Sequence, residues 1–139
     1  MKHILVAVDG SESSQRALEE GIQLGNALRE PAMLTALHID RNMPMNEPAL
    51  GFDPEAEIEA EGVALLDSVK KSLEHSGLNY KTVIRKGDPA REICEFAKAQ
   101  SVDLIIVGTK GQSLAAELLL GSVSHKVIQH ATCPVMSIR

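Results

Sequence analysis

Short hydrophobic runs alternate with amphipathic stretches along the whole chain. Runs rich in aliphatic and β-branched residues predict five strands, at residues 4–8, 33–39, 80–85, 104–107 and 135–138. Between them, hydrophobic residues at helical spacing predict helices at about 13–28 and 55–75, a third that opens at Asp88-Pro89 and a fourth that starts near Gly121-Ser122. This alternation indicates an α/β fold with one parallel sheet and helices on both of its faces.

The character of each strand predicts its place in the sheet. Residues 4–8 and 104–107 are uninterrupted apolar runs, which is typical of central strands covered by helices on both faces. Residues 80–85 alternate polar and apolar, and residues 135–138 follow a proline, so both should be edge strands. The order that satisfies these preferences is 3-2-1-4-5. Such a doubly wound sheet binds ligands beyond the carboxyl ends of its first and fourth strands.

Composition narrows the class of protein. A length of 139 residues with 44% hydrophobic residues suits one domain over residues 1–139. A net charge of -5 argues against a nucleic-acid partner. The sequence lacks a signal peptide and an apolar stretch of the roughly 20 residues that span a membrane, so we expect a cytoplasmic protein. Cys94 and Cys133 suggest neither a disulfide framework nor a metal site. The irregular segment at about 40–54 is interpreted as a loop that covers a ligand.

Polar, glycine-containing loops follow the two central strands. Asp9-Gly10-Ser11 follows the first, Gly108-Thr109-Lys110-Gly111 follows the fourth, and Gly121-Ser122 begins the last helix. Glycine lets backbone N–H groups approach a ligand closely, and a helix N-terminus offers unpaired N–H groups and a positive dipole end. The pattern therefore favours an anion site for phosphates. The spacing matches neither a P-loop nor the dinucleotide-binding GxGxxG motif.

These residues also have purely structural interpretations. Glycines after strands are often simple turn residues. Asp9 could cap the first helix, and Ser122 and Ser124 could cap the last one, without any ligand.

The spacing Gly108-x2-Gly111-x9-Gly121-Ser122 resembles the ATP-binding signature of the universal stress protein family. The segments VAVDGSESSQRAL, LTALHID, GDPAREI and CPVM resemble further parts of that family, in the same order. The resemblance implies a Rossmann-like fold of the adenine nucleotide alpha hydrolase type and a homodimer associated with stress adaptation. It also implies ATP as the ligand, with Mg²⁺ or Mn²⁺ bound through the phosphates.

The resemblance further implies a role for single residues. Asp9 would lie near the adenosine or the metal-bound phosphates, and the backbone of Ile39 would pair with the adenine edge. The cradle for phosphates and ribose would consist of Gly108, Thr109, Lys110, Gly111, Gly121, Ser122, Val123 and Ser124. No catalytic residue and no protein ligand for a metal is implied.

Three functions remain open at this point. The favoured one is an ATP-binding stress-response or regulatory protein. A slow ATPase or autophosphorylating enzyme could use the same crevice, although no base or arginine finger is evident. A nucleotide-free dimeric interaction module is the third. The adenylating enzymes of the pyrophosphatase-loop type are disfavoured, because the loop after the first strand lacks paired glycines. A homodimer would form through the exposed edge of residues 134–138.

Overall fold

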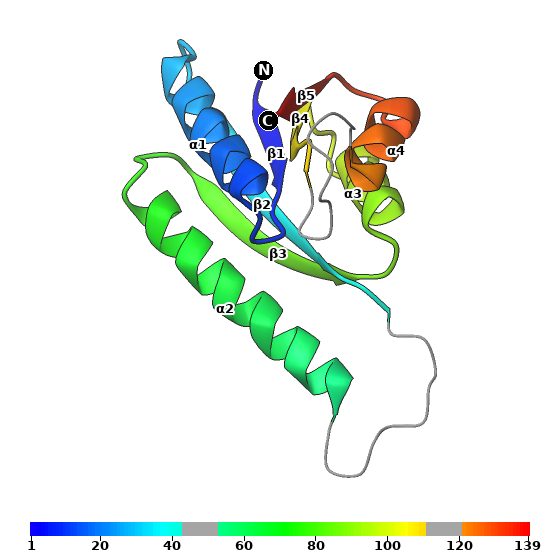
Figure 1. Cartoon of the computed structure of the whole chain (residues 1–139). Coiled ribbons are helices and arrows are strands. Elements are labelled where there is room, and N and C mark those ends of the chain that lie inside the picture. Colours follow the sequence, from blue (N-terminus) through cyan, green and yellow to red (C-terminus); the bar gives the residue numbers. More distant parts are fainter. Residues whose placement is uncertain (43–52, 111–120) are drawn as a thin grey trace.

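A computed structural model describes residues 1–42, 53–110 and 121–139. Five strands and four helices alternate along these residues (Figure 1). In chain order they are β1 His3–Ala7, α1 Glu12–Ala27, β2 Met33–Asp40, α2 Pro54–Glu74, β3 Tyr80–Lys86, α3 Pro89–Ala99, β4 Leu104–Gly108, α4 Ser122–His130 and β5 Val135–Ile138. No bound predicted from the sequence differs by more than one residue. Most of the predicted loop at 40–54 lies outside the described residues.

The strands form one parallel sheet in the order β3-β2-β1-β4-β5. The predicted order is therefore confirmed, with β1 and β4 as central neighbours and β3 and β5 at the edges. The middle residues of β1 and β4 are fully or almost fully buried, whereas most residues of β3 and β5 are partly exposed. Burial on both faces explains why the central strands are continuously apolar.

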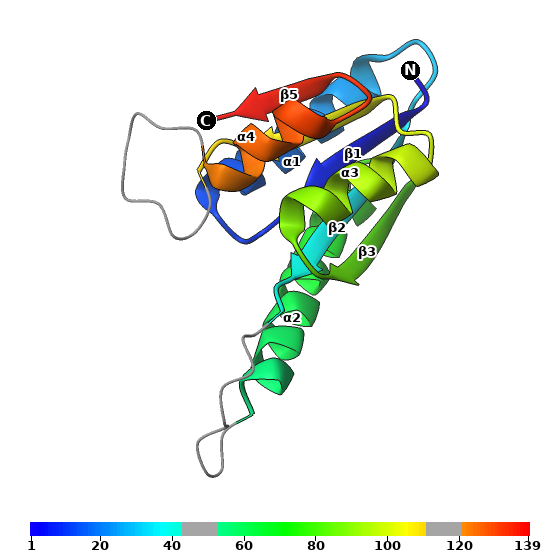
Figure 2. The ribbon, with the colours of Figure 1, turned by 90° about the vertical axis from the view of Figure 1, so that its right-hand side faces the viewer.

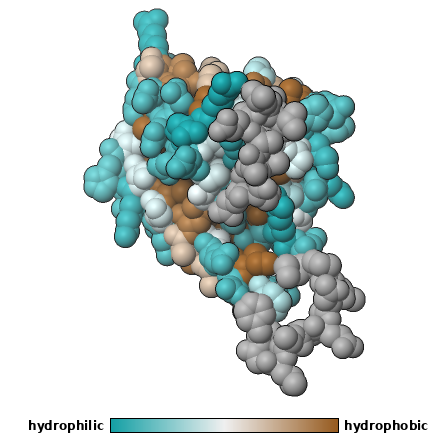
Figure 3. Space-filling view, viewed as in Figure 1, coloured by the Kyte–Doolittle hydropathy of each residue, from teal (hydrophilic) through white to brown (hydrophobic). Residues whose placement is uncertain are grey.

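Helices cover both faces of the sheet (Figure 2). α1 and α2 lie on one face, over a core that includes Ile4, Val6, Leu34 and Ile106. α3 and α4 lie on the other face, over a core that includes Leu5, Ile93, Ile105 and Val127. The side chains of each strand point alternately to the two faces, which is why neighbouring residues of β1 belong to different cores. The face seen in Figure 3 is mostly hydrophilic, with smaller hydrophobic patches.

Local signals fix where the helices begin. Asp88 accepts a hydrogen bond from the Arg91 N–H at 3.0 Å and precedes a proline, so it caps α3 as its sequence context predicts. Asp53 caps α2 in the same way. Within the described residues, none of the helices is long and apolar enough to cross a membrane.

Helical spacing over residues 55–75 predicts a buried stripe of Ile58, Gly62, Leu65, Val69 and Leu73. For α2 this prediction is partly wrong. Gly62, Val69 and Leu73 are buried, but Ile58 and Leu65 are partly exposed, and Leu66 is buried instead. The N-terminal end of α2 extends beyond the sheet (Figure 1). Ile58 and Leu65 instead line a cleft between α2 and the end of β2, which leaves them partly exposed.

Candidate functional site

A cleft lies at the carboxyl end of the sheet, where β1 and β4 are neighbours. The carboxyl ends of β1, β2 and β4 and the N-terminal turns of α1, α3 and α4 meet there. Seven of the ten predicted site residues line it: Asp9, Ile39, Gly108, Gly121, Ser122, Val123 and Ser124. Thr109 and Lys110 are not among the lining residues of the described part, and Gly111 lies outside the described residues.

Asp9 sits in the turn between β1 and α1. Its Oδ1 accepts a hydrogen bond from the Ser11 N–H at 2.9 Å, and its own N–H donates to the Ser14 hydroxyl at 3.3 Å. The N-cap of α1 is Ser11, whose hydroxyl accepts from the Ser14 N–H. Capping is therefore not the task of Asp9. Its carboxylate lines the cleft, held in place by the loop that follows it.

Ile39 offers its backbone to the cleft. The Gly87 N–H donates to the Asp40 carbonyl at 3.0 Å, so even-numbered residues of β2 pair with β3. The Val8 N–H donates to the Leu37 carbonyl at 2.9 Å, so odd-numbered residues pair with β1. Ile39 is odd-numbered and lies where β1 has ended. Its N–H and C=O therefore point into the space between the two strands.

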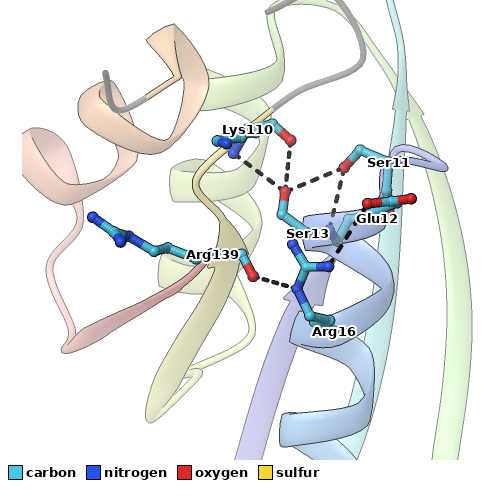
Figure 4. Close-up of polar contacts among 7 residues, drawn as sticks. Ser11, Glu12, Ser13, Arg16, Lys110 and Arg139 are labelled. Atoms are coloured by element: carbon cyan, nitrogen blue, oxygen red, sulfur yellow. Dashed lines mark hydrogen bonds and ion pairs between the residues drawn. The ribbon is translucent and has the colours of Figure 1, made fainter. Parts of the chain in front are cut away.

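Gly108 lets α1 approach β4 very closely. A side-chain carbon at this position would lie 2.7 Å from both the carbonyl carbon of Ser13 and the amide nitrogen of Ser14. This close approach allows two hydrogen bonds between α1 and the residue after Thr109 (Figure 4). The Ser13 hydroxyl donates to the Lys110 carbonyl at 2.6 Å and accepts from the Lys110 N–H at 3.2 Å. This glycine therefore has a packing reason of its own, whether or not a ligand is bound.

Further bonds tie the same region together. The Thr109 N–H donates to the Ile138 carbonyl at 2.7 Å, and the Thr109 carbonyl accepts from the Gly121 N–H at 2.6 Å. The Arg16 guanidinium donates to the Arg139 carbonyl (Figure 4). Thr109 and Lys110 thus connect the end of β4 to α1, β5 and α4, and Arg16 connects α1 to the residue after β5. These contacts do not need a ligand.

The N-terminus of α4 faces the cleft without a side-chain cap among the described residues. Gly121 is the N-cap, and the Ser124 hydroxyl is buried and donates to the Gly121 carbonyl at 2.9 Å. The hydrogen of that hydroxyl is therefore already used. The N–H groups of Ser122, Val123 and Ser124 belong to the first turn, where a helix provides no acceptor. With no acidic residue in this turn, the helix dipole favours an anion there.

Ten lining residues are not among the predicted site residues, and two of them carry a basic side chain. His38 and Arg41 both line the cleft, from the end of β2 and the turn after it. The His38 ring lies against the Val8 carbonyl, with its Nδ1 2.8 Å from the oxygen. Arg41 belongs to no sequence motif. It reaches the cleft only because β2 ends beside β1.

The remaining reactive side chains lie elsewhere. Burial raises the pKa of the Cys94 and Cys133 thiols, and neither residue lines the cleft. This fits small packing residues rather than nucleophiles. Among the described residues, no cluster of three or more His, Cys, Asp or Glu side chains could hold a metal ion.

The chain is similar to known proteins over its full length. The sequence profile of the universal stress protein family matches residues 1–139. Universal stress protein YxiE of Bacillus subtilis is 38% identical, covering 98% of this chain and 97% of that protein. The solved universal stress protein UspA from Lactobacillus plantarum is 30% identical with a TM-score of 0.77, covering 99% of this chain and 97% of that one.

A second solved structure is a universal stress protein family protein from Arabidopsis thaliana with AMP bound. It is 27% identical with a TM-score of 0.68, covering 99% of this chain and 91% of that one. The matched part of the chain includes the loop after β1, the end of β4 and the start of α4, which all line the cleft. On these grounds the chain belongs to the universal stress protein family.

Proposed function

We propose that this protein binds an adenine nucleotide, foremost ATP, in the cleft and acts as a cytoplasmic regulatory protein in stress adaptation. The observation that carries the proposal is the convergence of three kinds of group on one crevice. They are the Asp9 carboxylate, the outward-facing backbone of Ile39, and the N-terminus of α4, which no side chain of the described residues caps. The Arabidopsis relative with bound AMP supports the choice of an adenine nucleotide.

The groups suggest how a nucleotide would lie. The adenine edge would pair with the Ile39 backbone, and the phosphates would accept from the N–H groups at Ser122 and Val123. Asp9 would then lie beside the ribose. Mg²⁺ or Mn²⁺ would be carried mainly by the phosphates, which is the usual way in which Mg²⁺ binds to nucleotide sites.

We propose binding rather than efficient turnover. Phosphoryl transfer needs a positioned nucleophile, a base and charge stabilisation around the transferred group. Ser124, one candidate for self-phosphorylation, is buried and donates its hydroxyl hydrogen to the Gly121 carbonyl. A slow ATPase would show itself as phosphate release that stops when nucleotide binding is abolished.

Replacing Gly121 by Val should abolish nucleotide binding and leave the protein folded. The φ angle of Gly121 is −60°, which any residue adopts, so the variant acts through its added side chain in the cleft. A worse N-cap costs only about 1 kcal/mol. The measurement is calorimetric titration of ATP with Mg²⁺ into nucleotide-stripped protein. We expect a dissociation constant on the order of 1 μM for wild type and binding weaker by about a hundredfold or more for the variant.

Ile128→Ala is the matched control. Ile128 lies on the same helix, is 46% exposed and does not line the cleft, so this variant should bind ATP as wild type does. Denaturing the protein purified without added ligand and chromatographing what it releases provides a second readout. A wild type that releases no nucleotide and binds none would leave the nucleotide-free interaction module as the better interpretation.

We further propose a homodimer through residues 134–138. β5 is an edge strand, and the N–H groups of Ile105 in β4 and of Thr109 just after β4 donate to the carbonyls of Pro134 and Ile138. The backbone groups of Val135 and Ser137 therefore point away from β4, toward the free edge. A second copy can pair with them across a two-fold axis.

Ser137→Pro should weaken this dimer without disturbing the sheet. Proline removes an N–H that points away from β4 and leaves the bonds to β4 in place. Since a hydrogen bond contributes about 1 kcal/mol and each copy loses one, the dimer dissociation constant should rise about tenfold or more. Analytical ultracentrifugation measures it, and unchanged ATP binding controls for the fold. A wild type that is monomeric at micromolar concentration would contradict the dimer, and an unchanged dissociation constant would place the interface elsewhere.

A further inference from the structure

The imidazole of His38 lies in the wall of the nucleotide cleft and bridges two strands. Its Nδ1 lies 2.8 Å from the Val8 carbonyl oxygen, and its Nε2 lies 3.1 Å from Asp40 Oδ1. The side chain is 15% exposed. A second cleft lies against α2, and His38 and Asp40 line it too. The charged residues that line this second cleft with the pair are Asp9, Arg41 and Glu61.

Both ring nitrogens of His38 face acceptors. A carbonyl oxygen can only accept, so Nδ1 must carry a hydrogen. Nε2 faces a carboxylate, and a bare Nε2 would place two lone pairs against each other. The Asp40 side chain is only 6% exposed, and its Oδ1 has no well-aligned hydrogen bond among the described residues, although the ring lies within ion-pair distance. A buried carboxylate without such a bond is costly unless a positive charge lies beside it. The arrangement therefore favours a doubly protonated, cationic ring.

A glycine on α2 makes room for this pair. A side-chain carbon at Gly62 would lie 2.7 Å from Asp40 Oδ1 and 3.1 Å from His38 Cδ2. Glycine inside a helix costs about 1 kcal/mol relative to alanine. Its presence in the middle of a 21-residue helix is explained by the space that the pair occupies.

The contact with Val8 changes the backbone ladder at the base of the cleft. In a regular parallel ladder, the bond from the Val8 N–H to the Leu37 carbonyl would be followed by one from the Ile39 N–H to the Val8 carbonyl. Here the His38 ring donates to the Val8 carbonyl instead. The Ile39 N–H has no acceptor among the described residues. Both backbone polar groups of Val8 are thereby held, immediately before Asp9.

We propose that His38 is the positioning residue for the adenosine end of the cleft, through the Nδ1 hydrogen that it donates to the Val8 carbonyl. It holds the Val8 carbonyl so that the Ile39 N–H stays open to a nucleobase, and it fixes the chain that carries Asp9. This inference rests on the proposed nucleotide binding. It assigns a task to a side chain that need not touch the ligand itself.

Two amide variants separate the two ends of the ring. In His38→Asn the amide can donate to the Val8 carbonyl from the place of Nδ1 but cannot reach Asp40. In His38→Gln the amide reaches toward Asp40 and leaves the Val8 carbonyl without the ring donor. ATP titration should show affinity reduced about tenfold in the Gln variant, the effect of one lost hydrogen bond, and within about threefold of wild type in the Asn variant. Equal affinity of wild type and the Gln variant would overturn the positioning role.

The protonation state is tested separately, in the protein without nucleotide. Long-range ¹H–¹⁵N NMR of the His38 ring should show hydrogen on both nitrogens in wild type. In Asp40→Asn the new amide can donate to Nε2, so only Nδ1 should carry hydrogen while ATP still binds within about threefold of wild type. A bare Nε2 in wild type would overturn the cationic ring. If the wild type bound no adenine nucleotide, both the proposed function and the positioning role of His38 would be contradicted. The NMR measurement would still show whether Nε2 of the His38 ring carries a hydrogen.

Discussion

Replacing Gly108 by Ala should destabilise the protein by about 3 kcal/mol and abolish nucleotide binding. The new methyl group would lie 2.7 Å from backbone atoms of Ser13 and Ser14, so α1 and β4 would have to separate. Both hydrogen bonds between Ser13 and Lys110 would then be strained or lost. Since α1 begins at the cleft beside Asp9, the same displacement would open the site. Thermal unfolding should shift down by about 10 °C for a domain of this size.

Gly25→Ala is the matched control for this variant. A methyl group at Gly25 would also make a contact that is too short, at 2.8 Å, but with the Leu78 side-chain end rather than with backbone. A leucine side chain can rotate away, and alanine favours a helix over glycine by about 1 kcal/mol. The free energy of unfolding of the control should therefore lie within about 1 kcal/mol of the wild-type value, and the control should bind ATP normally. A Gly108→Ala variant as stable as the control would mean that the α1–β4 contact can relax at little cost.

The contact at Gly108 also changes how the glycine signature is read. From the sequence, this glycine was assigned to ligand approach, together with Gly111 and Gly121. In the structure it accommodates the first turn of α1, which brings Ser11 and Asp9 to the cleft. A glycine after a central strand can thus serve a site indirectly, by letting another element approach it.

Local patterns were sufficient to predict the fold. Each strand and helix is encoded in a short window of apolar spacing, and the contrast between continuous and alternating strands orders the sheet. The cleft follows, because a doubly wound sheet leaves its crevice where the chain reverses direction. Seven predicted site residues line it, since each stands at or just beyond the carboxyl end of a strand or at a helix start.

Contacts between distant residues were not predictable in this way. Ser13 and Lys110 are 97 positions apart, and nothing in either local window announces their bond. The helical period places Gly62 on the buried face of α2. The need for a glycine there comes from the His38–Asp40 pair, which lies on β2. Ile58 and Leu65 fitted the helical period yet remain partly exposed, because they line a cleft beside the end of β2 that the sequence does not reveal.

Val6→Ala and Gly21→Ala should each destabilise the protein alone and compensate each other when combined. Val6 is fully buried, and its truncation should cost about 2 kcal/mol through lost burial and a cavity. A methyl group at Gly21 would lie 2.8 Å from Val6 Cγ2 and 3.3 Å from Leu34 Cδ1. Overpacking there costs about 1–3 kcal/mol, partly offset by about 1 kcal/mol of helix propensity.

In the double variant the methyl group of Ala at position 21 would occupy the space that the Val6 methyl groups vacate. The clash and part of the cavity would then disappear together, so the double-mutant cycle should show a favourable coupling of about 1–2 kcal/mol. Urea unfolding of the four proteins measures it, and ATP titration reports whether α1 keeps its place, because this helix carries Ser11 and Ser14 to the cleft. Strictly additive effects would show that α1 shifts on the sheet to accept the methyl group, and nucleotide affinity should then fall in Gly21→Ala.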